Sequence, residues 1–303
     1  MKVLISGVTG MLGTSLAHCF LTRSHEVCGI SRGETLREPF PGERRQQADI
    51  TQPERLREVM TSFQPDVVIH SAAISDVDFC EREPETTYRI NAEGTRIMAQ
   101  AAEARGAVLV YISTDYVFDG ERNTPYREED PCRPVNHYGK SKWEGEKHVR
   151  ALCERHLIVR TSWLFGENQD SFVHHVLTRA KTKNTLRFVA DKWSTPTYTP
   201  DLAALIYSLL EKKLPFGVYH MTGGGEGCSW FEYGKTILRE RGVNNVSVLP
   251  MLLEDLKRPA RRPRYSVLSP EKFSDAAGMS LRPWQEALRA YVSQLHFNLE
   301  ERI

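Results

Sequence analysis

The chain has 303 residues, of which 40% are hydrophobic and 26% are charged, and its formal net charge is +1. This length and composition are ordinary for a globular protein whose core fills one large domain or two modest ones. The near-zero net charge gives the whole molecule no attraction for nucleic acid or for an anionic membrane surface, so neither is expected as a partner.

The first half of the sequence alternates short apolar runs with helical patterns. Buried strands are predicted at 2–6, 26–30, 66–70, 107–113 and 156–162. Helices are predicted at about 11–23, 53–63, 84–106 and 135–153, with a polar loop at 33–46. Because strands buried on both faces alternate with helices, residues 1–162 are expected to form an α/β domain, a doubly wound parallel Rossmann sheet. The functional loops of such a sheet lie at the carboxyl ends of its strands.

The rhythm changes after about residue 163. Short mixed segments and proline-containing turns such as STPTYTP and KLPFG follow, with an apparent helix at 283–298. Residues 163–303 are therefore expected to form a smaller α/β domain that mainly binds substrate. A helix at 200–213 is the segment that would return to the first domain.

The stretch SGVTGMLG places Gly7, Gly10 and Gly13 between the first strand and the first helix. Glycines allow a tight turn and close approach of a pyrophosphate, whose charge the free N–H groups at the start of a helix stabilise. The spacing resembles the extended short-chain dehydrogenase/reductase superfamily. The predicted cofactor loop consists of Gly7, Thr9, Gly10, Met11, Leu12 and Gly13.

The end of the second strand helps to distinguish NADP from NAD. It reads GISRG, with Ser31 and Arg32 and no acidic residue before Glu34, which favours the 2′-phosphate of NADPH over NADH. Arg32 could also be an ordinary surface arginine at a loop entrance. The superfamily resemblance implies that Asp49 and Ile50 lie at the adenine. It also implies that three small residues line the middle of the cofactor: Ser71, Ala72 and Ala73.

Three residues form the predicted catalytic set. Thr114 follows the fifth strand, and Tyr138 and Lys142 are four positions apart on one face of the next helix. A nearby ammonium and an oxidised nicotinamide would lower the pKa of the phenol from its usual value of roughly 10. Tyr138 would then give a proton to a carbonyl oxygen, Thr114 would donate a second hydrogen bond to it, and Lys142 would also bind the nicotinamide ribose. Asn91 matches an asparagine of the superfamily, with helix packing or backbone bonding as an equal alternative.

Longer motifs narrow the resemblance. The stretches STDYVFDG, PYREEDPCRPVNHYGKSKWEGE, VRTSWLFG, STPTYTPDLA and RPRYSVLSPEKF are similar to the dTDP-4-dehydrorhamnose reductase family over nearly the whole chain. The family implies reduction of a nucleoside-diphosphate 4-keto-6-deoxy sugar with NADPH or NADH. It implies these substrate contacts, besides Tyr138: Val77, Thr114, Asp115, Tyr116 and Trp163.

Other roles for the same residues remain open. Trp163 could be a plain core residue. Arg262, in the basic run RPARRPR, is predicted to meet the substrate pyrophosphate, although such a run is often a solvated loop.

The sequence also departs from relatives of this fold. Asp115-Tyr116 replaces the Asp-Glu pair of nucleotide-sugar 4,6-dehydratases, which excludes their acid–base elimination, whereas epimerases reuse the Thr/Tyr/Lys set and remain an alternative. Ser15 stands where some family members have a glutamate that helps to bind magnesium at a dimer interface, so no metal is predicted. The stretch VADKWSTPT lacks the glycine of the family pattern N/D-Q-x-G-x-P-T, so the sugar need not be rhamnose nor the nucleotide dTDP.

A protein of another class resembles the same family. The methionine adenosyltransferase β subunit has a similar PYREED…YGK stretch and acts by binding a catalytic partner, so a non-catalytic, NADP-binding regulatory subunit is the alternative. The intact RTSW stretch favours a sugar substrate.

The six cysteines are scattered, without a C-x-x-C pair or zinc-ligand spacing. They are typical of the reducing cytoplasm, and no stretch approaches the roughly 18 to 20 apolar residues that cross a bilayer. We expect a cytoplasmic protein, and the sequence leaves a homodimer open.

Overall fold

The protein, described here by a computed structural model over residues 1–33, 44–167 and 171–295, contains one large parallel sheet. Its seven strands lie in the order β11-β6-β5-β4-β1-β2-β3. They are β1 (Lys2–Ser6), β2 (Glu26–Ser31), β3 (Arg44–Gln47), β4 (Val67–His70), β5 (Val108–Thr114), β6 (His156–Thr161) and β11 (Gly217–His220). The predicted doubly wound parallel sheet is thereby confirmed, and the strand order reverses between β1 and β4.

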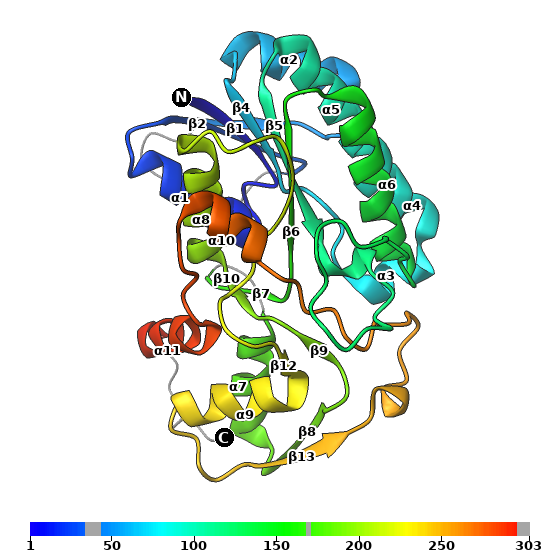
Figure 1. Ribbon diagram of the computed structural model, residues 1–303, viewed down its shortest axis with the longest axis vertical. Helices are drawn as coiled ribbons and strands as arrows, with labels where there is room; N and C mark the ends of the chain where they lie inside the picture. The colour runs from blue at the N-terminus through cyan, green and yellow to red at the C-terminus, as the bar shows by residue number, and fades with distance from the viewer. Residues whose placement is uncertain (34–43, 168–170, 296–303) are drawn as a thin grey trace.

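Helices cover both faces of the sheet, which gives three layers (Figure 1). One face carries α1 (Met11–Leu21), α8 (Thr199–Glu211) and α10 (Glu271–Ala277), and the other carries α2 (Pro53–Phe63), α5 (Gly94–Arg105) and α6 (His137–Leu152). Successive residues of a strand point to opposite faces. Val3 and Ile5 of β1 therefore belong to the core under α1 and α8, whereas Leu4 belongs to the core under α2 and α5.

The remaining elements form a second body with its own aromatic-rich core, in the lower part of Figure 1. It contains α7 (Phe172–Thr182), α9 (Trp230–Glu240) and α11 (Trp284–Gln294), beside the parallel pair β8 (Thr185–Val189) and β13 (Ser247–Met251). Two short strand pairs are separate from the large sheet: β7 (Leu164–Phe165) with β10 (Thr197–Tyr198), and β9 (Trp193–Ser194) with β12 (Cys228–Ser229).

The chain returns to the large sheet after leaving it. Helix α8, predicted at 200–213, packs against α1, and β11 then pairs in parallel with β6. The sequence reading had no strand at Gly217–His220, because four residues give little periodic signal.

Some predicted elements differ in detail. The predicted helix at 84–106 is α4 (Pro84–Tyr88), a π-helical turn at Arg89–Glu93, and α5, and it ends as expected at Gly106 in the left-handed conformation. A short helix α3 (Val77–Arg82) was not predicted. The expected loop at 33–46 was wrong at its end, because Arg44–Gln46 lie in edge strand β3. Residues 34–43 of that loop, and the last residues of the helix predicted at 283–298, lie outside the described part.

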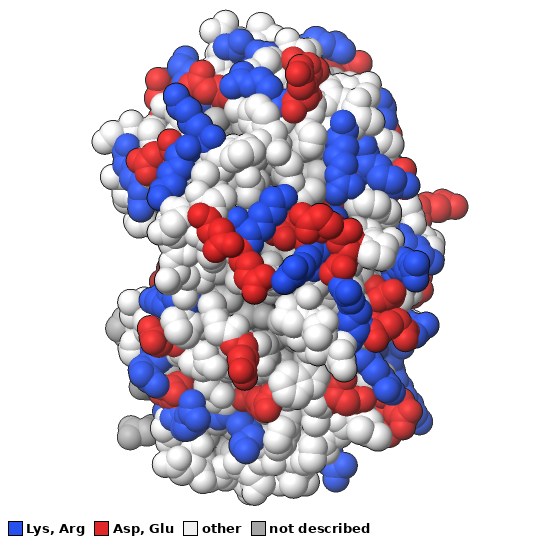
Figure 2. Space-filling model, in the orientation of Figure 1, with Lys and Arg blue, Asp and Glu red and all other residues white. Residues whose placement is uncertain are grey.

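The surface carries both signs of charge. Figure 2 shows lysine and arginine interspersed with aspartate and glutamate over the visible face, without one large region of a single sign. Every helix in the described part of the chain is too short or too polar to span a bilayer.

Candidate active site

A cavity of about 760 Å³ lies over the carboxyl ends of the sheet strands. The sheet brings the ends of β1, β2, β4, β5 and β6 to this edge, where the strand order reverses. Most of the sequence-predicted site residues line it, namely Gly7, Thr9, Gly10, Met11, Leu12, Gly13, Ser31, Arg32, Asp49, Ile50, Ser71, Ala72, Ala73, Val77, Thr114, Asp115, Tyr116, Tyr138, Lys142 and Trp163. Asn91 and Arg262 do not.

The glycine loop forms a cradle that side chains would fill. Gly7 has a φ of +69°, and a Cβ there would lie 2.8 Å from the Ala72 backbone. A Cβ on Gly13 would lie 2.1 Å from the Gly7 carbonyl oxygen. Gly10 is the N-cap of α1 without a side-chain cap, and the first turn of α1 contains no acidic residue. The loop therefore fits a pyrophosphate, because helix N–H groups and a positive dipole end face the cavity.

The ends of β2 and β3 form the next part of the cavity wall. Arg32 is exposed, and the Ser31 hydroxyl donates to the Gly33 carbonyl over 3.0 Å. Burial alone would raise the pKa of Asp49, but hydrogen bonds from Thr51 and the charge of Arg32 bring it below its ordinary value. Asp49 is therefore ionised at neutral pH, with its carboxylate held by the Thr51 backbone.

Thr114 is the last residue of β5, and its hydroxyl forms hydrogen bonds with the two residues that follow it. It donates to Asp115 Oδ1 over 3.1 Å and accepts from the Tyr116 backbone N–H over 3.2 Å. Tyr138, on the first turn of α6, packs edge-on against Tyr116 with ring centroids 5.8 Å apart. The start of α6 is fixed by Asn136, whose side-chain oxygen accepts from the Gly139 N–H over 2.8 Å.

Burial moves the pKa values of Tyr138 and Lys142 in opposite directions. It raises the pKa of the Tyr138 phenol, against a lowering effect of Thr114. It lowers the pKa of Lys142 to about 7, against the raising effect of Glu146. Lys142 is 3% exposed, and its Nζ lies 4.2 Å from the ring centroid of Tyr111. The side chains of the protein therefore do not by themselves produce the lowered phenol pKa that the sequence reading expected.

Asn91 forms hydrogen bonds to the backbone, which is one of the roles that the sequence allows. Its side-chain oxygen accepts from Ile74 N over 2.8 Å, and its amide nitrogen donates to Ile74 O over 3.0 Å and to Ser141 Oγ over 3.1 Å. It is fully buried in the π-helical turn. Asn91 thereby ties the loop after β4 to α6, two segments that line the cavity.

Aromatic residues form the wall that faces the second body. Trp163 lines the cavity and lies against Trp230 and Tyr233, with ring centroids 5.8 Å and 6.2 Å apart. Its φ of +40° is in the left-handed region, which costs a non-glycine residue about 1–2 kcal/mol. Val77, the first residue of α3, also faces the cavity.

Arg262 lies outside the cavity lining, and its guanidinium is engaged elsewhere. It donates to Asp78 Oδ2 over 2.8 Å and to the Ala260 carbonyl over 2.7 Å. Asp78 also accepts from Ala260 N. The pair joins α3 to the segment before Ser266 and leaves less of the guanidinium for a substrate than the sequence reading assumed.

Several lining residues were not predicted from the sequence. They are Ile30, Ala48, Ile74, Ser75, Ile90, Ile112, Ser113, Thr161, Ser162, Leu164, Ser171, Phe172 and His175. Ser171, Phe172 and His175 belong to the start of α7, in the second body. The sequence offers one signal for these residues: Ser171 is of a type that often begins a helix. That signal does not tell how far the helix lies from the carboxyl ends of the sheet strands.

Ser15, which stands where some family members have a metal-binding glutamate, forms hydrogen bonds within the protein. The Ser15 hydroxyl donates to Thr199 Oγ1 over 2.9 Å and to the Met11 carbonyl over 3.2 Å. Within the described residues, no group of three or more His, Cys, Asp or Glu side chains could hold a metal ion.

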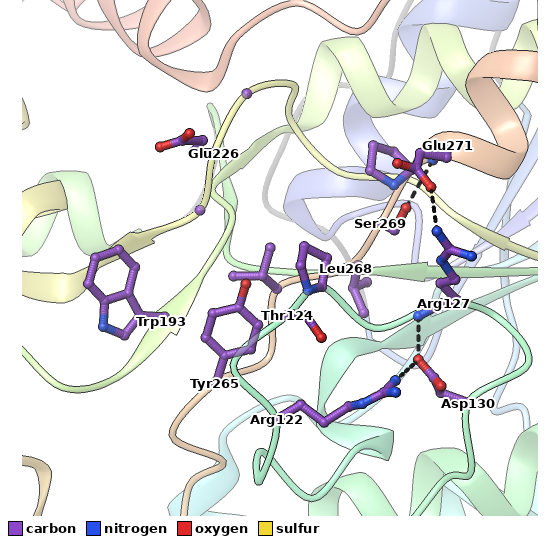
Figure 3. A pocket seen from close by; sticks show the side chains of 15 residues that line it. Arg122, Thr124, Arg127, Asp130, Trp193, Glu226, Tyr265, Leu268, Ser269 and Glu271 are labelled. Atoms are coloured by element: carbon purple, nitrogen blue, oxygen red, sulfur yellow. Dashed lines mark hydrogen bonds and ion pairs between the residues drawn. The ribbon is translucent and has the colours of Figure 1, made fainter.

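A second cavity, of about 770 Å³, contains none of the predicted site residues (Figure 3). Trp193 and Tyr265 line it together with two ion-paired arginines. Arg122 pairs with Asp130, and Arg127 lies 3.4 Å from Glu271.

The sequence is similar to known proteins over nearly its whole length. A family model described as the RmlD substrate binding domain matches residues 1–297. The spore coat polysaccharide biosynthesis protein SpsK of Bacillus subtilis is 37% identical over 293 residues, which cover 97% of each chain. A dTDP-4-dehydrorhamnose reductase of Aggregatibacter actinomycetemcomitans is 35% identical over 300 residues, covering 95% of this chain and 97% of that one.

Solved structures are similar as well. A dTDP-4-dehydrorhamnose reductase of Clostridium acetobutylicum superposes with a TM-score of 0.89 at 37% identity, covering 98% of this chain and 100% of the other. A dTDP-4-dehydrorhamnose reductase of Bacillus anthracis, in complex with NADP, has a TM-score of 0.88 at 34% identity, covering 97% and 99%.

Proposed function

Because the chain belongs to the dTDP-4-dehydrorhamnose reductase family, we propose that it is an NADPH-dependent reductase of a nucleoside-diphosphate 4-keto-6-deoxy sugar. One observation carries the proposal. A single cavity is lined both by the glycine loop and by the set Thr114, Tyr138 and Lys142. A carbonyl group in that cavity would meet a proton donor beside the cofactor site, which is the arrangement that carbonyl reduction needs.

Bound NADPH supplies the hydride for the carbonyl carbon. Tyr138 gives its phenolic proton to the carbonyl oxygen, so that the product is the alcohol. The growing negative charge on that oxygen makes it basic enough to take the proton. Burial opposes the transfer, because it raises the pKa of the Tyr138 phenol, and a nearby positive charge would offset this effect. Lys142, with a pKa of about 7, is partly protonated at neutral pH and can hold the ribose beside Tyr138 or replace the proton that Tyr138 loses.

The proposed preference for NADPH rests on Arg32. Its exposed side chain lines the cavity at the end of β2, where the adenosine ribose of a dinucleotide lies in this fold. The nearby carboxylate of Asp49 accepts two hydrogen bonds from Thr51 through its Oδ1 atom, so one of its two oxygens is already engaged. Arg32 is the guanidinium at the end of β2, and such a group favours a 2′-phosphate.

We also propose a location in the reducing cytoplasm. All six cysteines are free thiols, and five of them are buried.

The proposal is tested by following NADPH absorbance with the purified full chain. A dTDP-4-keto-6-deoxyhexose should be turned over, and the GDP, UDP and CDP counterparts identify the preferred nucleotide. Interconversion of sugars without net NADPH consumption would identify an epimerase instead. If the protein binds NADPH, turns over none of the four sugars and captures a methionine adenosyltransferase, the regulatory-subunit alternative is correct and the reductase proposal is wrong.

A further inference from the structure

A fully buried lysine stands behind the aromatic wall of the cavity. Lys192 is 0% exposed, and its Nζ lies 5.0 Å from the ring centroid of Tyr116, 5.3 Å from that of Trp163 and 6.0 Å from that of Trp230. Tyr116 and Trp163 line the cavity, whereas Lys192 does not. Burying an ammonium is costly unless it is paired, so the position of Lys192 calls for a partner.

The partner is Asp115, which is 2% exposed. Its Oδ2 accepts hydrogen bonds from Ser194 over 3.0 Å and from Ser266 over 2.5 Å. Lys192 Nζ donates to the same Ser266 hydroxyl over 3.3 Å. The chain Lys192–Ser266–Asp115 therefore leads from the buried ammonium to the residue next to Thr114.

The direction of these hydrogen bonds depends on the charge of Asp115. An ionised carboxylate only accepts, so the hydroxyl protons of Ser194, Ser266 and Thr114 all point toward it. Thr114 then has only lone pairs left, one of which accepts from the Tyr116 N–H. If Asp115 were neutral, it could itself donate, and the Thr114 proton would be free to point into the cavity.

The pKa values of Asp115 and Lys192 indicate that each residue affects the charge of the other. Burial raises the pKa of Asp115, while Lys192 and the three hydroxyl groups act to lower it. Burial lowers the pKa of Lys192 to about 8, Asp115 acts to raise it, and Arg262 acts to lower it further. Asp115 and Lys192 therefore each oppose the effect that burial has on the charge of the other.

Two neighbouring segments hold the network in place. The Trp193 N–H donates to the Arg264 carbonyl over 2.7 Å, and the Ser266 N–H donates to the Trp193 carbonyl over 2.9 Å. Successive residues of β9 face opposite sides, so Trp193 lines the second cavity (Figure 3) while Ser194 reaches Asp115. Ser194 occupies the position of the glycine that VADKWSTPT lacks, so that departure from the family pattern supplies one of the hydrogen bonds to Asp115.

We propose that Lys192 is a positioning residue that acts through Asp115 and thereby sets which way the Thr114 hydroxyl points at the substrate carbonyl. The inference rests on the proposed reductase function. While Lys192 keeps Asp115 ionised, Thr114 presents a lone pair to the sugar, in place of the second hydrogen bond to the carbonyl oxygen that the sequence predicts. Protonation of the reacting oxygen then falls to Tyr138 alone. Loss of the ammonium removes a charge that opposes protonation of Asp115, so the Thr114 proton is freed and its lone pair no longer holds the sugar in one orientation.

The test is a double-mutant cycle with Lys192→Met, Asp115→Asn and the double variant. Lys192→Met should lower kcat about 10-fold and change KM by less than about 3-fold, because the sugar still packs on Trp163. In the Asp115→Asn background the same change should alter kcat less than about 2-fold, because the charge through which Lys192 acts is already gone. Lys235→Met is the matched control, since Lys235 is exposed and lies 5.2 Å from the Phe231 ring centroid, outside the cavity lining.

A second measurement is independent of turnover. The denaturant concentration at the midpoint of unfolding, measured at pH 7, should show the same coupling. Lys192→Met should lower this midpoint in the wild type, but leave it unchanged or raise it in the Asp115→Asn background. An equal loss of kcat in both backgrounds, or additive shifts of the unfolding midpoint, would overturn the proposal. If the wild type reduces none of the keto sugars, the reductase function fails, and the unfolding cycle still decides whether Lys192 acts on Asp115.

Discussion

Tyr138 and Lys142 face the same cavity, but burial has opposite effects on their pKa values. It raises the pKa of the phenol, which stays protonated, and lowers the pKa of the amine to about 7. That combination suits a proton donor whose proton can be replaced from a neighbouring amine. The role of Tyr138 in the proposed reaction can therefore be tested by a substitution that removes its hydroxyl alone.

Tyr138→Phe removes only the phenolic oxygen. We expect kcat to fall by about 10²–10⁴-fold, the usual contribution of general acid catalysis, with NADPH affinity changed less than about 3-fold because the glycine loop is intact. Steady-state turnover and a fluorescence titration of NADPH measure the two quantities. Tyr207→Phe, on α8 and outside the cavity lining, is the control and should leave both unchanged. Normal turnover of Tyr138→Phe would refute the proton-donor role.

Arg32 provides the second prediction for a single residue. Arg32→Asp places a carboxylate where a 2′-phosphate would lie, and the loss of a charge-assisted hydrogen bond corresponds to roughly 10–100-fold. The ratio of kcat/KM for NADPH to that for NADH should therefore fall by at least about 10-fold. Arg57→Asp, on the exposed face of α2, tests for a general effect of charge. A ratio that stays constant in Arg32→Asp would contradict the assignment of the 2′-phosphate site.

At the scale of elements, the turn between β1 and α1 depends on close packing against the loop after β4. Gly7 and Gly106 have φ values of +69° and +70°, so an alanine is similarly strained at both positions. A Cβ at Gly7 would lie 2.8 Å from the Ala72 backbone, whereas a Cβ at Gly106 meets nothing within 4 Å. The two positions thus separate backbone strain from the loss of the cofactor cradle.

Gly106→Ala should lower the free energy of unfolding by about 1 kcal/mol and leave NADPH affinity unchanged. Gly7→Ala should be at least as destabilising and should also weaken NADPH binding by about 10-fold or more, because Ala72 must move away from the loop. Denaturant unfolding and NADPH titration of both variants check this. Equal NADPH affinity in the two variants would show that the turn does not form the phosphate cradle.

The elements that the sequence predicted are those with local signals. Gly7, Gly10 and Gly13, and the pair Tyr138 and Lys142, are each set by spacing within one turn or helix. The hydrogen bonds of Asp115 could not be predicted, because Ser194 and Ser266 lie 79 and 151 positions away along the chain. Strand β3, with the sequence RRQQ, has no apolar periodicity and exists because it pairs with the edge of β2.

Two buried histidines make the whole fold sensitive to acid. His70 lies between the hydroxyls of Ser6 and Thr95, and His220 lies beside the guanidinium of Arg160. Burial lowers the pKa of each to about 3, with further lowering by Lys142 and Arg160 respectively. Both imidazoles are therefore neutral in the folded protein throughout the physiological range.

The folded chain binds fewer protons at these sites than the unfolded chain between pH 3 and 6.5, so stability falls as the pH is lowered through that window. From pH 7 to pH 5 the loss should be about 2 kcal/mol for each histidine. Denaturant unfolding at the two pH values measures it, and His70→Asn should show a loss smaller by about that amount. An unchanged pH dependence in His70→Asn would mean that His70 does not account for the acid sensitivity.

Strand β11 pairs with the edge of β6, although the whole stretch from β7 to α8 separates them in the chain. During synthesis on the ribosome, β6 therefore emerges long before its neighbour and presents a row of unpaired N–H and C=O groups on an apolar strand. Such an edge is a template for pairing with other chains. A nascent or prematurely terminated chain that stops before Gly217 thus exposes the six-residue edge of β6, whereas the completed sheet ends on that side in the shorter, four-residue strand β11.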